Sequence, residues 1–176
     1  MEKTDDHKRK YQARIKVSPQ INNILTSYID RVGCDHIFLG EYHNGESNIA
    51  TAIPFCKYSV TTECCKPGVG KSFLQNFTNE NVTKYNILPI LLNKHLVSYE
   101  IEELKDVDYY LYLQLLSFDV KDITICAMAD FEGFPMGFIG CVNYNESDKT
   151  NIQELLSCKD EIKQILIDIN KNENNK

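Results

Sequence analysis

Amphipathic helical patterns stand at both ends of the chain and enclose two strand–turn–strand patterns. Apolar side chains recur every three or four positions over residues 18–32, and they do so again over residues 152–169. An amphipathic helix is stable only when another element covers its apolar face, and hairpins assemble into antiparallel sheets. The sequence therefore predicts an α+β fold in which both terminal helices cover one face of a central antiparallel sheet.

Two hairpin patterns supply the strands of this sheet. The first contains Asn44-Gly45, a dipeptide typical of tight hairpin turns, after a continuous apolar run. The second has its turn at residues 130–135, where charged, glycine and proline residues separate two apolar runs. The four strands are expected over residues 36–42, 49–60, 123–129 and 136–144.

The middle of the chain is less regular. Residues 85–92 are apolar and are interrupted by Pro89, so we expect this segment to be extended. Asp106 or Asp108 can cap a helix that runs through Leu116, because an aspartate side chain accepts hydrogen bonds from the first free amides of a helix. A short helix near residues 72–77 and a short strand over residues 97–101 complete the expected elements.

Charge divides the chain into a basic end and an acidic body. Residues 1–16 carry a formal charge of +3 and the remainder carries −9, so the N-terminal tail is the only segment with the charge to bind nucleic acid. We expect a basic, flexible tail over residues 1–17, one domain over 18–169 and a polar C-terminal tail over 170–176. The partner-binding candidates in the basic tail are Lys8, Arg9, Lys10, Arg14 and Lys16.

The sequence indicates a soluble protein of a reducing, intracellular compartment. Apolar runs are too short to cross a bilayer, and the charged N-terminal segment does not resemble a signal peptide. The seven cysteines are an odd number, and several stand inside apolar runs, where a free thiol behaves as a small core side chain. We therefore expect neither membrane insertion nor a disulfide framework.

Two segments of the chain resemble GAF domains. They are residues 29–45, which end in His-Asn-Gly, and residues 130–142, which contain a Gly-Phe-Ile-Gly strand. Together with residues 57–63, they resemble the GAF-like domains encoded by tailed bacteriophages. The resemblance spans residues 18–169, and it implies a pocket covered by loops and a helix on the sheet face opposite the terminal helices.

The resemblance implies a non-catalytic interaction module. In the phage group, this is a structural or assembly component that binds other protein subunits, in the host cytoplasm or in the virion. The alternative is a small-ligand-sensing GAF domain that acts through a partner protein. The Cys-His dipeptide to which phytochrome-type GAF domains attach a tetrapyrrole is absent from the sequence, and we expect no cofactor.

The pocket candidates combine the polar end of the first hairpin with tyrosines of the middle region. A tyrosine has an apolar ring and a polar hydroxyl, which suits both small-molecule pockets and protein interfaces. The ligand-pocket candidates are Glu41, His43, Asn44, Tyr58, Glu63, Tyr85 and Tyr109.

Motifs for catalysis and metal binding are incomplete. Gly68–Ser72 matches the end of a phosphate-binding loop, but Cys65 stands where that motif needs its first glycine. Cys64 and Cys65 are adjacent, which does not suit one zinc ion. Glu41 and His43 share one strand face, where a hydrogen-bonded pair is expected rather than a metal. We therefore expect no catalytic residue and no metal site.

Overall fold

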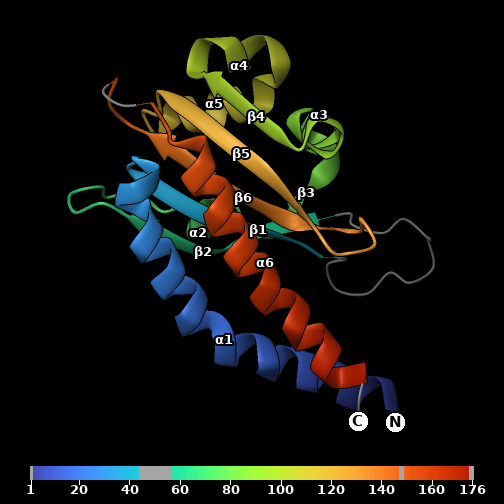
Figure 1. The fold of residues 1–176 in the computed structure, drawn as a ribbon. Helices are drawn as coiled ribbons and strands as arrows, with labels where there is room; N and C mark the ends of the chain where they lie inside the picture. The colour runs from blue at the N-terminus through green and yellow to red at the C-terminus, as the bar shows by residue number, and fades with distance from the viewer. Residues whose placement is uncertain (1, 44–56, 147–148, 175–176) are drawn as a thin grey trace.

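A six-stranded antiparallel sheet forms the centre of the molecule, in the strand order β3-β2-β1-β6-β5-β4 (Figure 1). The computed structural model describes residues 2–43, 57–146 and 149–174. The predicted α+β class and the antiparallel sheet are confirmed. The strands are β1 (His36–His43), β2 (Lys57–Cys65), β3 (Glu80–Asn81), β4 (Leu96–Glu100), β5 (Asp122–Ala129) and β6 (Pro135–Asn143).

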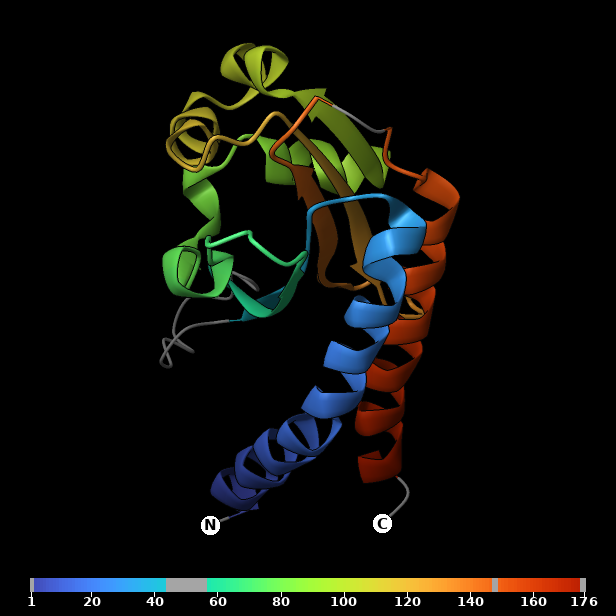
Figure 2. The ribbon, with the colours of Figure 1, turned by 90° about the vertical axis from the view of Figure 1, so that its left-hand side faces the viewer.

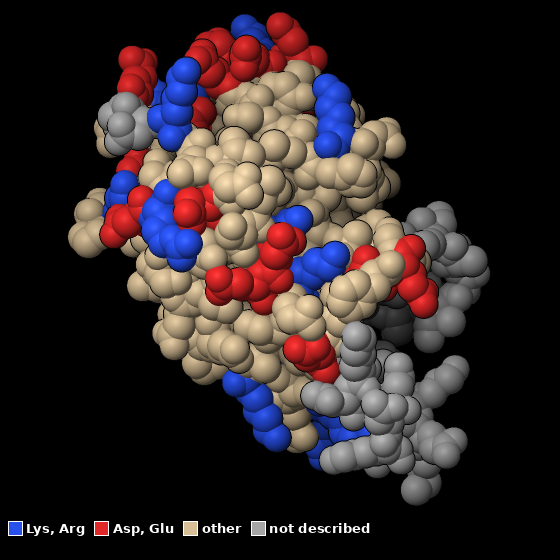
Figure 3. All heavy atoms as spheres, in the orientation of Figure 1, with Lys and Arg blue, Asp and Glu red and all other residues tan. Residues whose placement is uncertain are grey.

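Helices cover both faces of the sheet (Figure 2). The two long terminal helices, α1 (Glu2–Val32) and α6 (Ile152–Asn174), pack together against one face. The opposite face and the β4 edge carry shorter helices, and acidic side chains gather around α4 (Figure 3). The shorter helices are α2 (Phe73–Asn76), the 3₁₀ helix η1 (Val82–Lys84), α3 (Ile87–Lys94), α4 (Ile101–Val107) and α5 (Tyr109–Ser117).

Burial on both faces explains why the central strands are apolar without alternation. In β1, the side chains of Ile37 and Leu39 lie in the core beneath α1 and α6. The neighbouring side chain, Phe38, lies in the second core, beneath the shorter helices. The second core contains the cavity described below.

The start of α1 corrects one prediction from the sequence. The helix begins at Glu2, so residues 2–17 are helical rather than a flexible tail. Ser18-Pro19 is a pair typical of helix starts, but it lies inside α1, where the Ser18 hydroxyl donates to the Arg14 carbonyl one turn back. Pro19 lies inside α1, where its ring removes one backbone donor, and the helix changes direction about midway (Figure 1).

Two other segments are helical where the sequence predicted otherwise. α6 continues to Asn174, into the expected polar tail over residues 170–176. Residues 87–92, expected to be extended, belong to α3. Pro89 is the third residue of that helix, where a backbone N–H would have no acceptor inside the helix, so proline costs no hydrogen bond there.

Among the remaining elements, β2 differs from its prediction and α5 agrees with it. β2 runs from Lys57 to Cys65, further than the predicted end at residue 60, and residues 49–56 lie outside the described part. Asp108, one of the two predicted caps, does cap α5. The Leu111 amide donates a 2.9 Å hydrogen bond to its Oδ1. Within the described ranges, no helix is long and apolar enough to cross a bilayer.

Candidate functional site: an apolar cavity with a tyrosine pair

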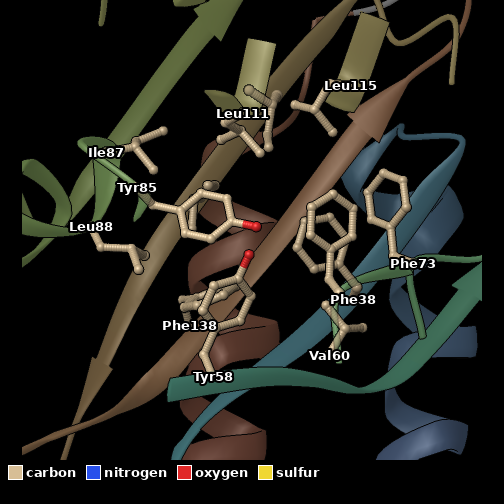
Figure 4. A pocket seen from close by; sticks show the side chains of 13 residues that line it. Phe38, Tyr58, Val60, Phe73, Tyr85, Ile87, Leu88, Leu111, Leu115 and Phe138 are labelled. Atoms are coloured by element: carbon tan, nitrogen blue, oxygen red, sulfur yellow. The ribbon is translucent and has the colours of Figure 1, made fainter. Parts of the chain in front are cut away.

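An apolar cavity of about 30 Å³ lies between the sheet and helices α3 and α5 (Figure 4). This volume holds about two water molecules. The side chains that line the cavity come from every layer of this half of the molecule. They are Phe38, Tyr58, Val60, Phe73, Phe77, Tyr85, Ile87, Leu88, Leu111, Leu115, Ile123, Ile125 and Phe138.

Glycines opposite two phenylalanines shape the floor of the cavity. In the β1–β6 ladder, Phe38 pairs with Gly140 and Phe138 pairs with Gly40. A Cβ added to Gly140 would lie 2.4 Å from the Phe38 ring, and one added to Gly40 would lie 2.3 Å from the Phe138 ring. Each ring therefore lies directly across the backbone of the neighbouring strand, where any side chain would collide with it.

A pair of tyrosines lines one side of the cavity, whose surface is apolar throughout. The rings of Tyr58 and Tyr85 meet in edge-to-face geometry with their centres 5.2 Å apart, and their hydroxyl groups point toward each other (Figure 4). The Tyr85 hydroxyl also lies 2.9 Å from Glu80 Oε2 and 3.1 Å from Gln114 Oε1. Burial raises the pKa of both tyrosines, so both hydroxyls keep their protons at neutral pH.

Asp108 holds together the two helices that cover the cavity. Its side chain is buried, and Oδ2 accepts a 3.0 Å hydrogen bond from the amide of Ile87, the first residue of α3. Oδ1 accepts from Leu111 in the first turn of α5. One carboxylate therefore satisfies free amides of two helices, and it fixes Ile87 and Leu111 at the cavity wall.

A buried histidine that the sequence analysis did not single out supports the opposite wall. His36 is fully buried, with Nε2 3.0 Å from Glu63 Oε2 and Nδ1 2.8 Å from the Tyr144 hydroxyl. Glu63 in turn accepts hydrogen bonds from Ser72 Oγ at 2.6 Å and from the Phe73 amide at 2.7 Å. Glu63 therefore anchors the start of α2 rather than lining the cavity.

Stability should depend on pH through Glu63. Burial alone would raise the pKa of this carboxyl, but hydrogen bonds from His36, Ser72 and the Phe73 amide outweigh burial and lower it. A carboxyl whose folded-state pKa lies below its unfolded value stabilises the fold above the unfolded pKa, about 4.3. This contribution is lost as the pH falls through the folded-state pKa.

Urea unfolding of the wild type and Glu63→Gln between pH 3 and pH 7 tests this expectation. The difference in unfolding free energy should be largest above about pH 5 and should narrow as the pH falls below about 4. Glu132→Gln, at an exposed position of the β5–β6 turn, is the control and should show no such trend. A Glu63→Gln difference that stays constant with pH contradicts the assignment.

Glu41 and His43 lie on the other face of the sheet, which corrects their placement in the pocket. Arg14 binds the Glu41 carboxylate with Nη2 at 2.7 Å and Nε at 3.1 Å, which ties β1 to α1. His43 Nε2 lies 2.9 Å from Ser59 Oγ in β2, and burial and the charge of Lys57 lower the pKa of His43. Both residues lie on the same face of β1 as Leu39, and α1 and α6 cover that face.

The other predicted residues divide between the cavity and the surface. Tyr58 and Tyr85 line the cavity, whereas Tyr109 is 57% exposed on the outer face of α5. Asn44 lies outside the described residues. In the predicted tail, Lys8, Arg9 and Lys16 are exposed on α1, Lys10 lies in the same helix, and Arg14 binds Glu41.

The glycine-rich segment Gly68–Ser72 does not form a phosphate-binding loop. The Lys71 ammonium group donates to the Phe118 carbonyl and forms an ion pair with Asp119 Oδ2 at 2.7 Å. The helix that follows, α2, has only four residues, so it offers little helix dipole. Across residues 2–43, 57–146 and 149–174, no three potential ligands converge on a metal position.

Solved structures of GAF domains match this fold over most of the chain. The GAF domain of PixJ from Thermosynechococcus elongatus, in its blue-light-absorbing form, has a TM-score of 0.66 and 7% identity, covering 92% of this chain and 89% of PixJ. A GAF domain/HD domain protein from Geobacter sulfurreducens has a TM-score of 0.64 and 12% identity, with coverages of 88% and 92%. The phycocyanobilin-bound GAF domain of a cyanobacterial phytochrome has a TM-score of 0.57 and 13% identity, with coverages of 91% and 90%.

These similarities show that the chain has the GAF fold, which confirms that part of the resemblance. At these identities, the similarity establishes the fold alone. No protein-family model and no curated protein sequence matches the chain. Nothing in the comparisons links the chain to bacteriophage proteins, so the finer resemblance has no support from them.

Proposed function

We propose that this domain is a non-catalytic sensor of a small molecule, which binds in the cavity and acts through a partner protein. The observation that carries the proposal is the cavity itself, which lies inside the domain core and has apolar walls. Small-molecule sites are lined predominantly by apolar and aromatic side chains, as this cavity is. A solved GAF domain with bound phycocyanobilin supports the proposal by analogy of fold.

A ligand larger than two water molecules requires the cavity to expand. The walls include Phe73 on the four-residue helix α2 and Tyr85 at the end of η1, a three-residue helix. Short segments of this kind open locally at a lower free-energy cost than the central strands. Ligand entry by displacement of these segments would also give the partner protein a changed surface to recognise.

Native mass spectrometry of the wild type and Ile125→Phe tests the proposal. Ile125 is buried on β5 and lines the cavity, so a larger ring at this position should fill the space. After incubation with a cell extract, the wild type should carry an added small mass, and Ile125→Phe should not. The control is Ile15→Phe, the same change at a 51% exposed position on α1.

A wild type that takes up no added mass, and whose melting temperature responds to no compound in a metabolite library, contradicts the proposed function. Equal uptake by Ile125→Phe places the ligand outside the cavity and contradicts it as well.

Assembly with other protein subunits is the second candidate function. An open groove between α1 and α6 is lined partly by Ala13, Val17, Ile165 and Ile169. Close by along α1, Tyr11 is 69% exposed and Ile15 is 51% exposed, which extends the apolar surface beside the groove. In the same native mass spectra, a ligand-free oligomer of defined size would favour this second function over the first.

A further inference from the structure

We propose that the outer edge of β4 binds an extended, basic segment of a partner protein, which adds a strand to the sheet. This inference concerns the edge of the sheet rather than the cavity, so it holds whether or not the cavity binds a ligand. Three features lead to it: the outward backbone groups of β4, the lack of protection along this edge and the carboxylates at its end.

β4 is the last strand on one side of the sheet and pairs with β5 alone (Figure 1). Two backbone hydrogen bonds fix which of its residues face β5. The Ala127 amide donates to the His95 carbonyl at 2.8 Å. The Ile101 amide donates to the Lys121 carbonyl, also at 2.8 Å. Because bonded and outward residues alternate in an antiparallel ladder, the odd-numbered residues of 95–101 bond to β5 and the even-numbered ones point outward.

The outward residues of β4 are Leu96, Ser98 and Glu100. The Glu100 amide is already bonded, at 3.0 Å, to Oε2 of Glu103 in α4. The amides and carbonyls of Leu96 and Ser98 have no hydrogen-bond partner within the described part of the chain. Ser98, in the middle of the strand, is exposed. An extended peptide beside β4 can therefore bond to these two residues as the next strand of a sheet would.

β4 lacks most of the features that protect an edge strand from pairing. Proline, bulges and charged side chains usually serve this purpose. The five residues of β4 include no proline, keep one register with β5 throughout, and carry a single charge, on the last residue, Glu100. The opposite edge strand, β3, has only two residues, so it offers little to pair with. β4 is therefore the edge at which a strand can be added.

The carboxylates at the end of β4 favour a basic segment. An open groove of about 690 Å³ lies where β4 is followed by α4, and carboxylates outnumber lysines along it. Burial raises the pKa of Asp122 in this groove, and the charges of Asp35 and Glu100 raise it further. The charged residues that line the groove are Glu100, Glu102, Asp122, Glu146, Lys121 and Lys149.

The same charges disfavour a second copy of this chain as the occupant. Two β4 strands paired about a two-fold axis would bring together the acidic side chains around α4 of both copies (Figure 3). Residues 17–176 carry a formal charge of −9, so the bodies of two copies repel each other. A segment that carries lysine or arginine meets the opposite situation, because its charge complements the groove.

Two short peptides test the charge of the occupant. One alternates threonine with lysine and the other alternates threonine with glutamate, and threonine favours the extended conformation in both. The fluorescence anisotropy of the labelled peptide measures affinity, and the NMR amide signals of Leu96 and Ser98 show where it binds. The lysine peptide should shift both signals and slow their hydrogen exchange. The glutamate peptide should do neither.

Ser98→Pro tests the backbone contact. Proline removes the outward N–H and places its ring at the edge, while the ladder with β5 keeps its bonds because the Ser98 amide does not take part in it. The variant should bind the lysine peptide at least about fivefold more weakly, the value of one ordinary hydrogen bond. Ser98→Ala is the matched control, because it keeps the N–H and loses only the hydroxyl, 2.8 Å from Thr124 Oγ1. It should bind as the wild type does.

A modified peptide gives the same test without changing the protein. The lysine peptide methylated on its four central backbone nitrogens cannot donate along either of its edges, so it should not bind the wild type. This measurement decides the question even if Ser98→Pro fails to fold.

The groove carboxylates are tested by replacing Glu102 and Glu146 together with glutamine. Both residues are exposed, and the double variant should narrow the preference for the lysine peptide about threefold. Glu132→Gln, on the β5–β6 turn, is the control and should leave the preference unchanged.

Four results would overturn the inference. They are binding of the glutamate peptide as tight as that of the lysine peptide, equal affinities of Ser98→Pro and Ser98→Ala, binding of the methylated peptide, and no shift of the two amide signals at millimolar peptide. A dimer that forms without peptide and is lost in Ser98→Pro would assign the edge to a second copy instead. None of these results concerns the cavity, so the sensor function is tested separately.

Discussion

Replacing Gly137 by alanine is expected to cost about 3 kcal/mol or more of stability, because the new methyl group has no space. Its Cβ would lie 2.0 Å from the carbonyl oxygen of Gly40 and 3.1 Å from the Cα of Glu41. Both are backbone atoms of β1, and Glu41 is the direct partner of Gly137 in the β1–β6 ladder. The clash can be relieved only by moving apart two central strands of the sheet.

Urea unfolding followed by circular dichroism measures this loss, and a failure to obtain folded protein counts as the same result. Gly70→Ala is the matched control, because a Cβ at that position meets no atom within 4 Å. Its stability should stay within about 0.5 kcal/mol of the wild type. A Gly137→Ala protein as stable as the control would contradict the close approach of β1 and β6.

Phe73→Ala is expected to lose about 3–5 kcal/mol, the range for removing a fully buried aromatic side chain. Phe73 is 1% exposed, and its ring centre lies 4.3 Å from that of His36 and 5.1 Å from that of Phe38. It also contacts Phe77 and Phe118 in edge-to-face geometry. Removing the ring takes away the shared contact of β1, α2 and the end of α5.

The same substitution should also change the cavity. Because Phe73 lines it, Phe73→Ala leaves a larger apolar space, and a two-ring probe such as naphthalene should bind the variant more tightly than the wild type. The control is Leu74→Ala, the next residue of α2, which is 41% exposed. A loss in Phe73→Ala no larger than in the control would show that α2 is not anchored by this ring.

The sequence was sufficient where one local pattern determines one element. The β5–β6 hairpin has two apolar runs separated by Gly133 and Pro135, so the strands and the turn were predicted from neighbouring residues. The helix of residues 152–169 was predicted because its apolar stripe has no competing pattern. The GAF fold was reached through a resemblance, and its sheet order depends on contacts that local patterns do not contain.

The sequence was not sufficient where a local signal competes with packing at a distance. Ser18-Pro19 is a good start for an isolated helix, but α1 continues through it to run beside α6. Pro89 suggested an extended segment, but it falls in the first turn of α3, where proline is tolerated. In both cases, tertiary contacts outweigh the preference of one dipeptide or one residue.

The pocket candidates show the same limit in β1. Alternation correctly places Glu41 and His43 on one face, but residues 36–40 are buried on both faces. Nothing in the pattern then tells which face meets the terminal helices and which meets the cavity. His36 and Glu63 face each other only because β1 and β2 pair in one particular register, which the sequence does not reveal.

The paired terminal helices have a practical consequence for protein engineering. The far ends of α1 and α6 extend beyond the sheet, and both ends of the chain lie at the same end of the molecule (Figures 1 and 2). A host protein could therefore carry this domain as a graft in one surface loop, joined through two flexible glycine–serine linkers. The sheet and the cavity of the grafted domain would face away from the host protein. Only α1 and α6 would connect them to the host.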